Sequence, residues 1–195
     1  KMTESSQSKT ALVRIYLRRG EILKQDNRLQ DAISNYDQAL EIIPGNTDLL
    51  YARGLTGESI GNVELLEADM LTILKTEPDN AHALNALGFT LADRTNRIKE
   101  AYEYLKRAMQ IKPEDPAFID SFGWVNYRMG NYDEAIRLLK KALSQVEDGE
   151  IAAHLGEVLW VTGKQKEALG IWNRALKKSP KDRNILKTMK RFNQK

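Results

Sequence analysis

The stretch Met129-Gly130-Asn131-Tyr132-Asp133-Glu134-Ala135-Ile136 decides the fold, because altered copies of it recur along the chain. Each copy carries a small or apolar anchor residue that corresponds to Ala135. The five anchors are Ala32, Leu66, Ala101, Ala135 and Ala168. Their nearly constant spacing of roughly 34 residues predicts an array of one small structural repeat. Such arrays bind other molecules far more often than they transform them.

The fourth copy, residues 116–148, shows what one repeat contains. Apolar and small residues recur at the i, i+3, i+4, i+7 spacing before and after the quoted stretch, which predicts two amphipathic helices. They are Ile119, Phe122, Gly123, Asn126 and Tyr127, then Ala135, Leu138, Leu139 and Ala142. Between the two runs, Gly130-Asn131 interrupts the pattern and predicts a tight turn that needs a residue tolerant of positive φ.

Glycines and prolines recur at fixed offsets from the anchors. Gly20, Gly54, Gly88, Gly123 and Gly156 lie twelve or thirteen residues before them, inside the first predicted helix. A helical glycine costs about 1 kcal/mol relative to alanine, so we expect that the paired helix approaches closely at these positions. Pro44, Pro78, Pro113 and Pro180 lie twelve residues after their anchors and predict the end of the second helix.

Three departures from this pattern mark places where the array is expected to bend or loosen. The third repeat has one extra residue in its turn, within 94–99, and the fourth has Glu147 in place of the closing proline. In the second repeat Gly57 occupies a position usually filled by a bulky residue, which predicts loose packing there.

These offsets resemble the consensus of the tetratricopeptide repeat, which has a small glycine, a later alanine, a second small residue and a closing proline. The resemblance implies an all-α, right-handed solenoid of about five helix-turn-helix repeats with a C-terminal capping helix. The predicted repeats cover residues 13–46, 47–80, 81–115, 116–148 and 149–181. Residues 1–12 are expected to form a tail or the remnant of a preceding helix, and residues 182–195 the capping helix and tail.

Segments 80–94, 120–128 and 153–160 also resemble the C-terminal repeats of bacterial outer-membrane lipoproteins. One member of that family delivers substrates to a carboxyl-terminal processing protease. The resemblance implies a periplasmic adaptor that is anchored to the outer membrane in the full-length protein, with a cytoplasmic location as the alternative. Because the chain begins with Lys1, we expect it to be a fragment, from which an upstream signal or lipid-attachment cysteine would be missing.

Composition argues against several function classes. The absence of cysteine excludes disulfides, zinc ribbons and thiol catalysis. The sequence contains no apolar run long enough for a transmembrane helix, and its first ten positions lack the apolar core of a signal peptide. His82 and His154, the only histidines, have no ligand-type partner at i+4, so we expect no metal site and no cofactor. No catalytic set of side chains can be assembled, and the sequence predicts a non-enzymatic scaffold.

The net charge of +3 is unevenly distributed. Residues 164–195 contain eleven Lys or Arg and two acids, so this segment carries a local charge of +9. One interpretation is a solvated capping helix, which we favour. The alternative is a surface for a nucleic acid, an anionic membrane or an acidic partner, and of these nucleic acid is disfavoured. A third hypothesis is a regulatory domain of a larger enzyme.

The tetratricopeptide resemblance implies a concave groove lined by the first helix of each repeat, in which a protein or peptide binds. The groove candidates are Tyr51, Leu55, Asn85, Phe89, Asp93, Asp120, Trp124, Tyr127, Arg128, Glu157 and Trp160. Their aromatic rings would form a floor flanked by acids, which favours a peptide with apolar side chains and Lys or Arg. The alternative is that the large side chains only pack against the neighbouring repeat. Trp172 is expected in the core, and the protein is expected to be a monomer or weak homo-oligomer.

Overall fold

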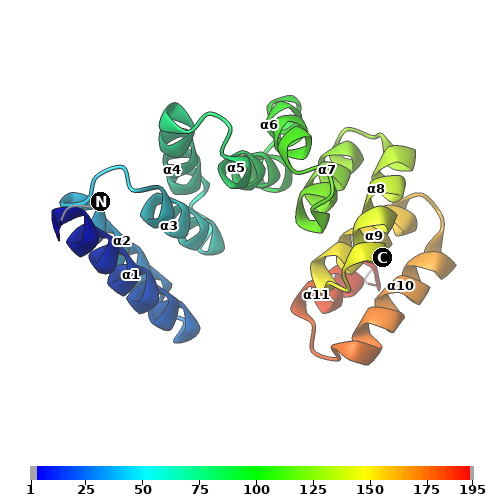
Figure 1. Cartoon of the computed structure of the whole chain (residues 1–195). Helices are drawn as coiled ribbons and strands as arrows, with labels where there is room; N and C mark the ends of the chain where they lie inside the picture. The colour runs from blue at the N-terminus through cyan, green and yellow to red at the C-terminus, as the bar shows by residue number, and fades with distance from the viewer. Residues whose placement is uncertain (1–3, 194–195) are drawn as a thin grey trace. The chain divides into compact units, whose positions relative to one another are not determined.

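The computed structural model describes residues 4–193, which form eleven α-helices and no strand (Figure 1). The helices are α1 (Glu4–Gln25), α2 (Leu29–Ile42), α3 (Thr47–Ser59), α4 (Val63–Thr76), α5 (Ala81–Arg94), α6 (Ile98–Ile111), α7 (Pro116–Arg128), α8 (Tyr132–Gln145), α9 (Gly149–Val161), α10 (Gln165–Lys178) and α11 (Arg183–Asn193). The predicted all-α class is confirmed. α1 begins at Glu4, so most of the segment expected to be a tail or a remnant instead continues the first helix.

The chain divides into two compact units, which we call the N-terminal unit (Lys1–Thr90) and the C-terminal unit (Leu91–Lys195). The division falls within α5. In the N-terminal unit α1 packs on α2 and α3 on α4. In the C-terminal unit α7 packs on α8, α9 on α10, and α11 covers α9. None of the described helices is long and apolar enough to cross a membrane.

The turns between paired helices adopt the predicted left-handed conformation. Gly130 has φ of 83°, as the quoted stretch predicts, and Gly61, Gly163 and Asn27 have φ of 83°, 82° and 57° at the equivalent places. The second helices α2, α4, α6 and α10 each end two residues before a proline. α8 has no such proline, and its C-terminal flanking residue Val146 is extended instead, with φ of −144° and ψ of 134°.

The predicted close approach at the helical glycines is confirmed in four repeats. A Cβ atom added at Gly156 would lie 2.0 Å from the Trp172 indole nitrogen, and one added at Gly20 would lie 2.1 Å from the Tyr36 hydroxyl. At Gly54 and Gly123 the equivalent side chains are Met70 and Leu139, each 2.9 Å away. In every case the covering residue lies sixteen positions later, on the paired helix.

The prediction of loose packing at Gly57 is wrong. Gly57 is buried, and a Cβ atom there would lie 2.9 Å from Leu65 Cδ2. The Leu65 side chain of the second helix, α4, thus fills the space beside Gly57.

Each unit has its own core. In the N-terminal unit Val13, Leu23, Tyr36 and Leu49 pack together. In the C-terminal unit one cluster includes Trp172, which has no exposed surface, and Ile185 of α11. The expected core position of Trp172 is therefore confirmed.

Candidate protein-binding surface

Four of the predicted groove residues lie in the N-terminal unit, on α3 and α5, and all four are half-buried. They are Tyr51, Leu55, Asn85 and Phe89. The Tyr51 ring meets His82 edge-on, with 6.3 Å between ring centroids, and burial raises the pKa of Tyr51. The Asn85 carbonyl oxygen is buried and accepts no hydrogen bond from the part of the chain that the structure describes.

In the C-terminal unit a buried pair joins α7 to α9. The Asp120 carboxylate accepts from His154 Nδ1, with 3.0 Å to each of its oxygens. Burial alone would lower the pKa of His154, but the charge and hydrogen bond of Asp120, with smaller contributions from Glu150 and Glu157, raise it above its ordinary value of 6.5. The Asp120 carboxylate therefore favours the protonated form of His154.

Two aromatic rings extend this pair. The Trp124 indole stacks on His154, with 4.2 Å between centroids and 25° between planes, and its centroid lies 5.0 Å from that of Tyr127. A protonated imidazole on an indole face gains cation–π attraction. Only 5% of Trp124 is exposed, and within the described residues its Nε1 donates no hydrogen bond. Trp124 is therefore a buried side chain that packs against His154 and Tyr127.

The network continues to the capping helix. The Tyr127 hydroxyl donates to Glu157 Oε1 at 3.2 Å, and Arg191 of α11 forms an ion pair with the same carboxylate. Burial, followed by the negative charge of Glu157, raises the pKa of Tyr127 to about 12. Asp120 and Glu157, which the sequence placed on an acidic rim, are thus buried and paired within the chain.

Two other predicted residues hold the scaffold together. Arg128 donates to the backbone carbonyls of Ala92, Asp93 and Thr95 and so ties the end of α5 to α7. Trp160 stacks on Trp172, with 5.6 Å between ring centroids, and is half-buried. Both side chains therefore have partners within the chain. This agrees with the alternative interpretation, in which large first-helix side chains pack against a neighbouring repeat.

The acids that face solvent here are Asp93 and Glu150. Asp93 is 29% exposed and pairs with the adjacent Arg94, whereas Glu150 forms no ion pair within the described residues. Partial shielding from water raises the pKa of Glu150. The charge of His154 lowers this pKa, and the negative charges of Asp120, Asp148 and Asp93 raise it further. From here on, the acidic-aromatic surface means Asp93, Tyr127 and Glu150 together with the buried Trp124 and His154, whose rings stack on each other.

Sequence reasoning missed the roles of His154 and Arg191. One signal was available: Asp120 with His154, and Glu157 with Arg191, are opposite charges separated by one repeat period. Residues one period apart occupy the same position on neighbouring first helices, where they can meet. No group of three or more potential metal ligands occurs among the described residues.

The buried pair predicts a pH-dependent stability of the C-terminal unit. The folded-state pKa of His154 is raised, so its contribution is fully present below pH 6.5 and is lost as pH rises through the raised pKa. We expect His154→Gln to lose about 1–3 kcal/mol at pH 6 and less at alkaline pH. Urea unfolding at both pH values, followed by tryptophan fluorescence, measures this. A loss that does not vary with pH would contradict the charged pair.

Two sequence models, both described as tetratricopeptide repeat, match the chain. One matches residues 13–46 and 81–115, and the other matches residues 122–183. These matches cover more than half of the chain. The chain belongs to the tetratricopeptide repeat family. Tetratricopeptide repeats generally mediate protein–protein interactions, and the family and fold are typically non-enzymatic scaffolds.

Among curated proteins, a TPR repeat-containing protein of Pseudomonas aeruginosa is 42% identical over 145 residues, covering 74% of this chain and 25% of its own length. Anaphase-promoting complex subunit 7 of mouse is 24% identical over 92% of this chain and 32% of its own length. The chain thus spans about a third or less of the length of these relatives. A thermophilic TPR protein of Thermus thermophilus has the same fold, with a TM-score of 0.79, 24% identity, and coverage of 91% of this chain and 97% of that chain.

Proposed function

We propose that this chain is a non-enzymatic adaptor, in which the acidic-aromatic surface of the C-terminal unit binds a partner segment that carries Lys or Arg and apolar side chains. The observation that carries this proposal is Glu150, which is exposed and forms no ion pair among the described residues. The negative charges of Asp120, Asp148 and Asp93 act on it, opposed by His154. A ligand cation would pair with Glu150, and the half-buried Tyr127 ring offers an apolar contact on the same helix pair, α7 and α9.

The internal network makes this surface rigid before a partner arrives. Asp120 fixes His154, His154 stacks on Trp124, and Glu157 holds both Tyr127 and Arg191. A surface that is already ordered loses little conformational entropy on binding, which favours affinity.

In the N-terminal unit we propose Tyr51, Leu55, Asn85 and Phe89 as further contact residues. Their support is half-burial, which leaves part of each side chain accessible. The concave groove implied by the family resemblance stays a prediction.

The test is charge reversal at the surface. We expect Glu150→Lys to weaken binding of a capped peptide that carries Lys and Leu at least about tenfold, because attraction becomes repulsion. Isothermal titration calorimetry measures the affinity. Glu103→Lys on α6 is the matched control: Glu103 is exposed and forms no ion pair among the described residues, so this variant should bind as the parent does. Equal affinities in all three proteins would contradict the proposal.

At a finer level, we propose that the adaptor serves in a bacterial envelope and presents substrates to a carboxyl-terminal processing protease. Its support is the resemblance of segments 80–94, 120–128 and 153–160 to the lipoprotein family. Fractionation of cells that express the full-length protein tests this. We expect it in the outer-membrane fraction, in complex with the protease, and recovery in the cytosol would contradict the envelope role.

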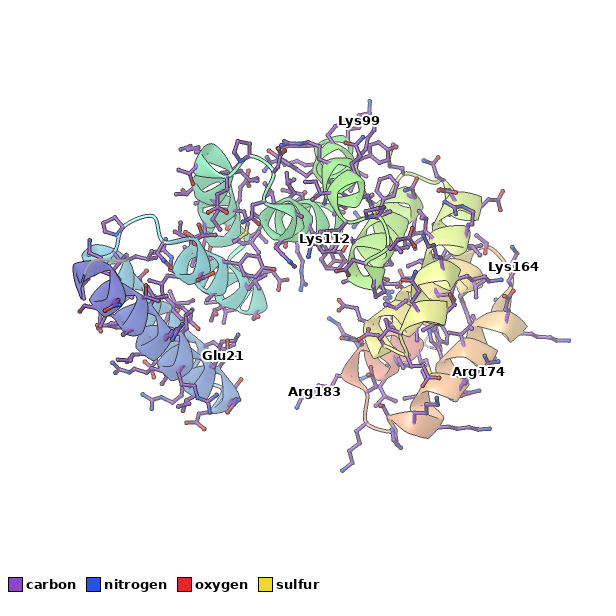
Figure 2. The ribbon with its side chains drawn as sticks, viewed as in Figure 1. Glu21, Lys99, Lys112, Lys164, Arg174 and Arg183 are labelled. Carbon is purple, nitrogen blue, oxygen red and sulfur yellow. The ribbon has the colours of Figure 1, made fainter. Side chains whose placement is uncertain are left out.

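A second candidate function is binding to an anionic surface, favoured by the cations near the C-terminus. Five of them are exposed and form no ion pair among the described residues: Lys177, Lys181, Arg183, Lys187 and Lys190. Arg183 projects away from the start of α11 (Figure 2). This function predicts an affinity that falls steeply with salt, whereas a complex that is insensitive to salt would count against it.

A further inference from the structure

A cavity of about 190 Å³ lies in the C-terminal unit, where the α8–α9 linker meets α10 and the start of α11. Its apolar lining consists of Leu143, Ala152, Ile171, Ala175 and Ile185. Drug-sized ligands occupy pockets of about 300–1,000 Å³, so this cavity suits a single aliphatic group. None of its lining residues belongs to the acidic-aromatic surface.

The cavity forms at the repeat whose closing proline is replaced by Glu147. The linker there is short, and it leads directly into Gly149, the first residue of α9. A Cβ atom at Gly149 would lie 1.9 Å from Asp182 Oδ2, so a larger residue there would require the Asp182 side chain to move. The cavity thus lies at an irregular position of the repeat sequence.

One cation at the cavity has no partner. Arg174 lies on α10 (Figure 2), between Ile171 and Ala175 in the stripe that lines the cavity, and it is exposed. Among the described residues no side chain forms an ion pair with Arg174. Its guanidinium group is therefore available to a ligand that reaches the apolar lining.

The acids around the cavity are already occupied. Glu147 pairs with Lys178, Asp148 accepts from the backbone N–H groups of Glu150 and Ile151, and Asp182 accepts from that of Ile185. Two of the three acids thus serve as N-caps of α9 and α11, where helix dipoles offset their charge. Arg174 is the cation of the lining that forms no ion pair among the described residues.

We propose that this cavity binds an aliphatic carboxylate, with the branched apolar group inside and the carboxylate paired with Arg174. A guanidinium group matches a carboxylate through two parallel N–H···O bonds, which adds geometric selectivity to the charge. Such a ligand is either the C-terminal residue of a peptide or a free short-chain acid. The two share the chemistry that the cavity recognises.

NMR titration of the ¹⁵N-labelled chain tests the site with three probes. They are acetyl-Gly-Ser-Gly-Leu with a free carboxylate, the same peptide as its C-terminal amide, and 4-methylpentanoate. We expect the free-carboxylate peptide, the free acid, or both to shift the amide signals of Gly149, Ala152 and Ala175. Shifts with the peptide alone identify a peptide C-terminus as the source, and equal affinity for 4-methylpentanoate identifies a free acid.

Substitution separates the site from its fold. Arg174→Gln should weaken the binding of the carboxylate about tenfold or more, because a charge-assisted pair is lost. Lys177→Gln removes the same charge from the same helix outside the cavity and should leave the affinity unchanged. Both residues are exposed, so both variants should keep the parent melting temperature. Equal binding of acid and amide, or no shift with either carboxylate at millimolar concentration, would overturn the proposal.

Discussion

Replacing Trp172 with alanine is expected to lower the free energy of unfolding of the C-terminal unit by about 3–5 kcal/mol. The Trp172 indole has no exposed surface and fills the space over Gly156, where no side chain fits. It also stacks on Trp160 and Phe192, with 5.6 and 6.3 Å between ring centroids. The substitution thus opens a cavity and loosens the contact between α9, α10 and the capping helix.

Urea unfolding followed by tryptophan fluorescence measures this loss without interference from the N-terminal unit. All three tryptophans, Trp124, Trp160 and Trp172, lie in the C-terminal unit, and two remain as probes in the variant. Trp160→Ala is the control, because Trp160 is only half-buried and should lose less. A loss for Trp172→Ala below that of Trp160→Ala would show that the indole is not the centre of this core.

Replacing Arg53 with methionine is expected to destabilise the N-terminal unit by about 2–4 kcal/mol at neutral pH. The Arg53 guanidinium joins three helices: Nη1 lies 2.6 Å from Asp37 of α2, and Nη2 and Nε lie 2.5 and 3.0 Å from Asp69 of α4. Asp69 is only 2% exposed. Methionine keeps the apolar stem but leaves the Asp69 carboxylate buried without its cation.

The destabilisation caused by Arg53→Met depends on pH because the Asp69 carboxyl titrates. Burial raises its pKa, and Arg53 lowers it, so the pKa rises further in the variant. A raised carboxyl pKa favours the folded state at low pH, and that benefit is lost as pH rises. The deficit of Arg53→Met should therefore shrink between pH 7 and pH 5.

Amide hydrogen exchange of α2, α3 and α4 measures this deficit. The double variant Arg53→Met/Asp69→Leu should recover most of the loss, because the unpaired charge is removed with its partner. Arg28→Met breaks the exposed pair with Asp31 and should change protection little. Equal effects of Arg28→Met and Arg53→Met would contradict the role of the buried carboxylate.

Local features of the fold followed from single residues in the sequence. The left-handed turn at Gly130 and the close approach at Gly156 depend on the absence of a side chain, which sequence shows directly. Gly57 misled the prediction because its space is filled by Leu65 of the paired helix, and a neighbour's conformation cannot be deduced from one position.

The candidate surface was harder to predict, because charge pairing between repeats decides which side chains remain available. Asp120 and Glu157 occupy predicted lining positions but are paired with His154 and Arg191, each one repeat away. Glu150 lacks such a partner among the described residues and remains available. The pairing of each acid depends on distances between side chains of different repeats. The helical periodicity of the sequence gives no information about those distances.

The most direct test of the proposed adaptor role is to map where a basic, apolar peptide binds. NMR titration of the ¹⁵N-labelled chain with a peptide that carries Lys and Leu, and is capped at both ends, excludes binding through a terminal carboxylate. We expect the largest shifts at Asp93, Tyr127 and Glu150, and their loss in Glu150→Lys. Shifts confined to α10 and α11, or no shifts at saturating peptide, would contradict the acidic-aromatic surface as the binding site.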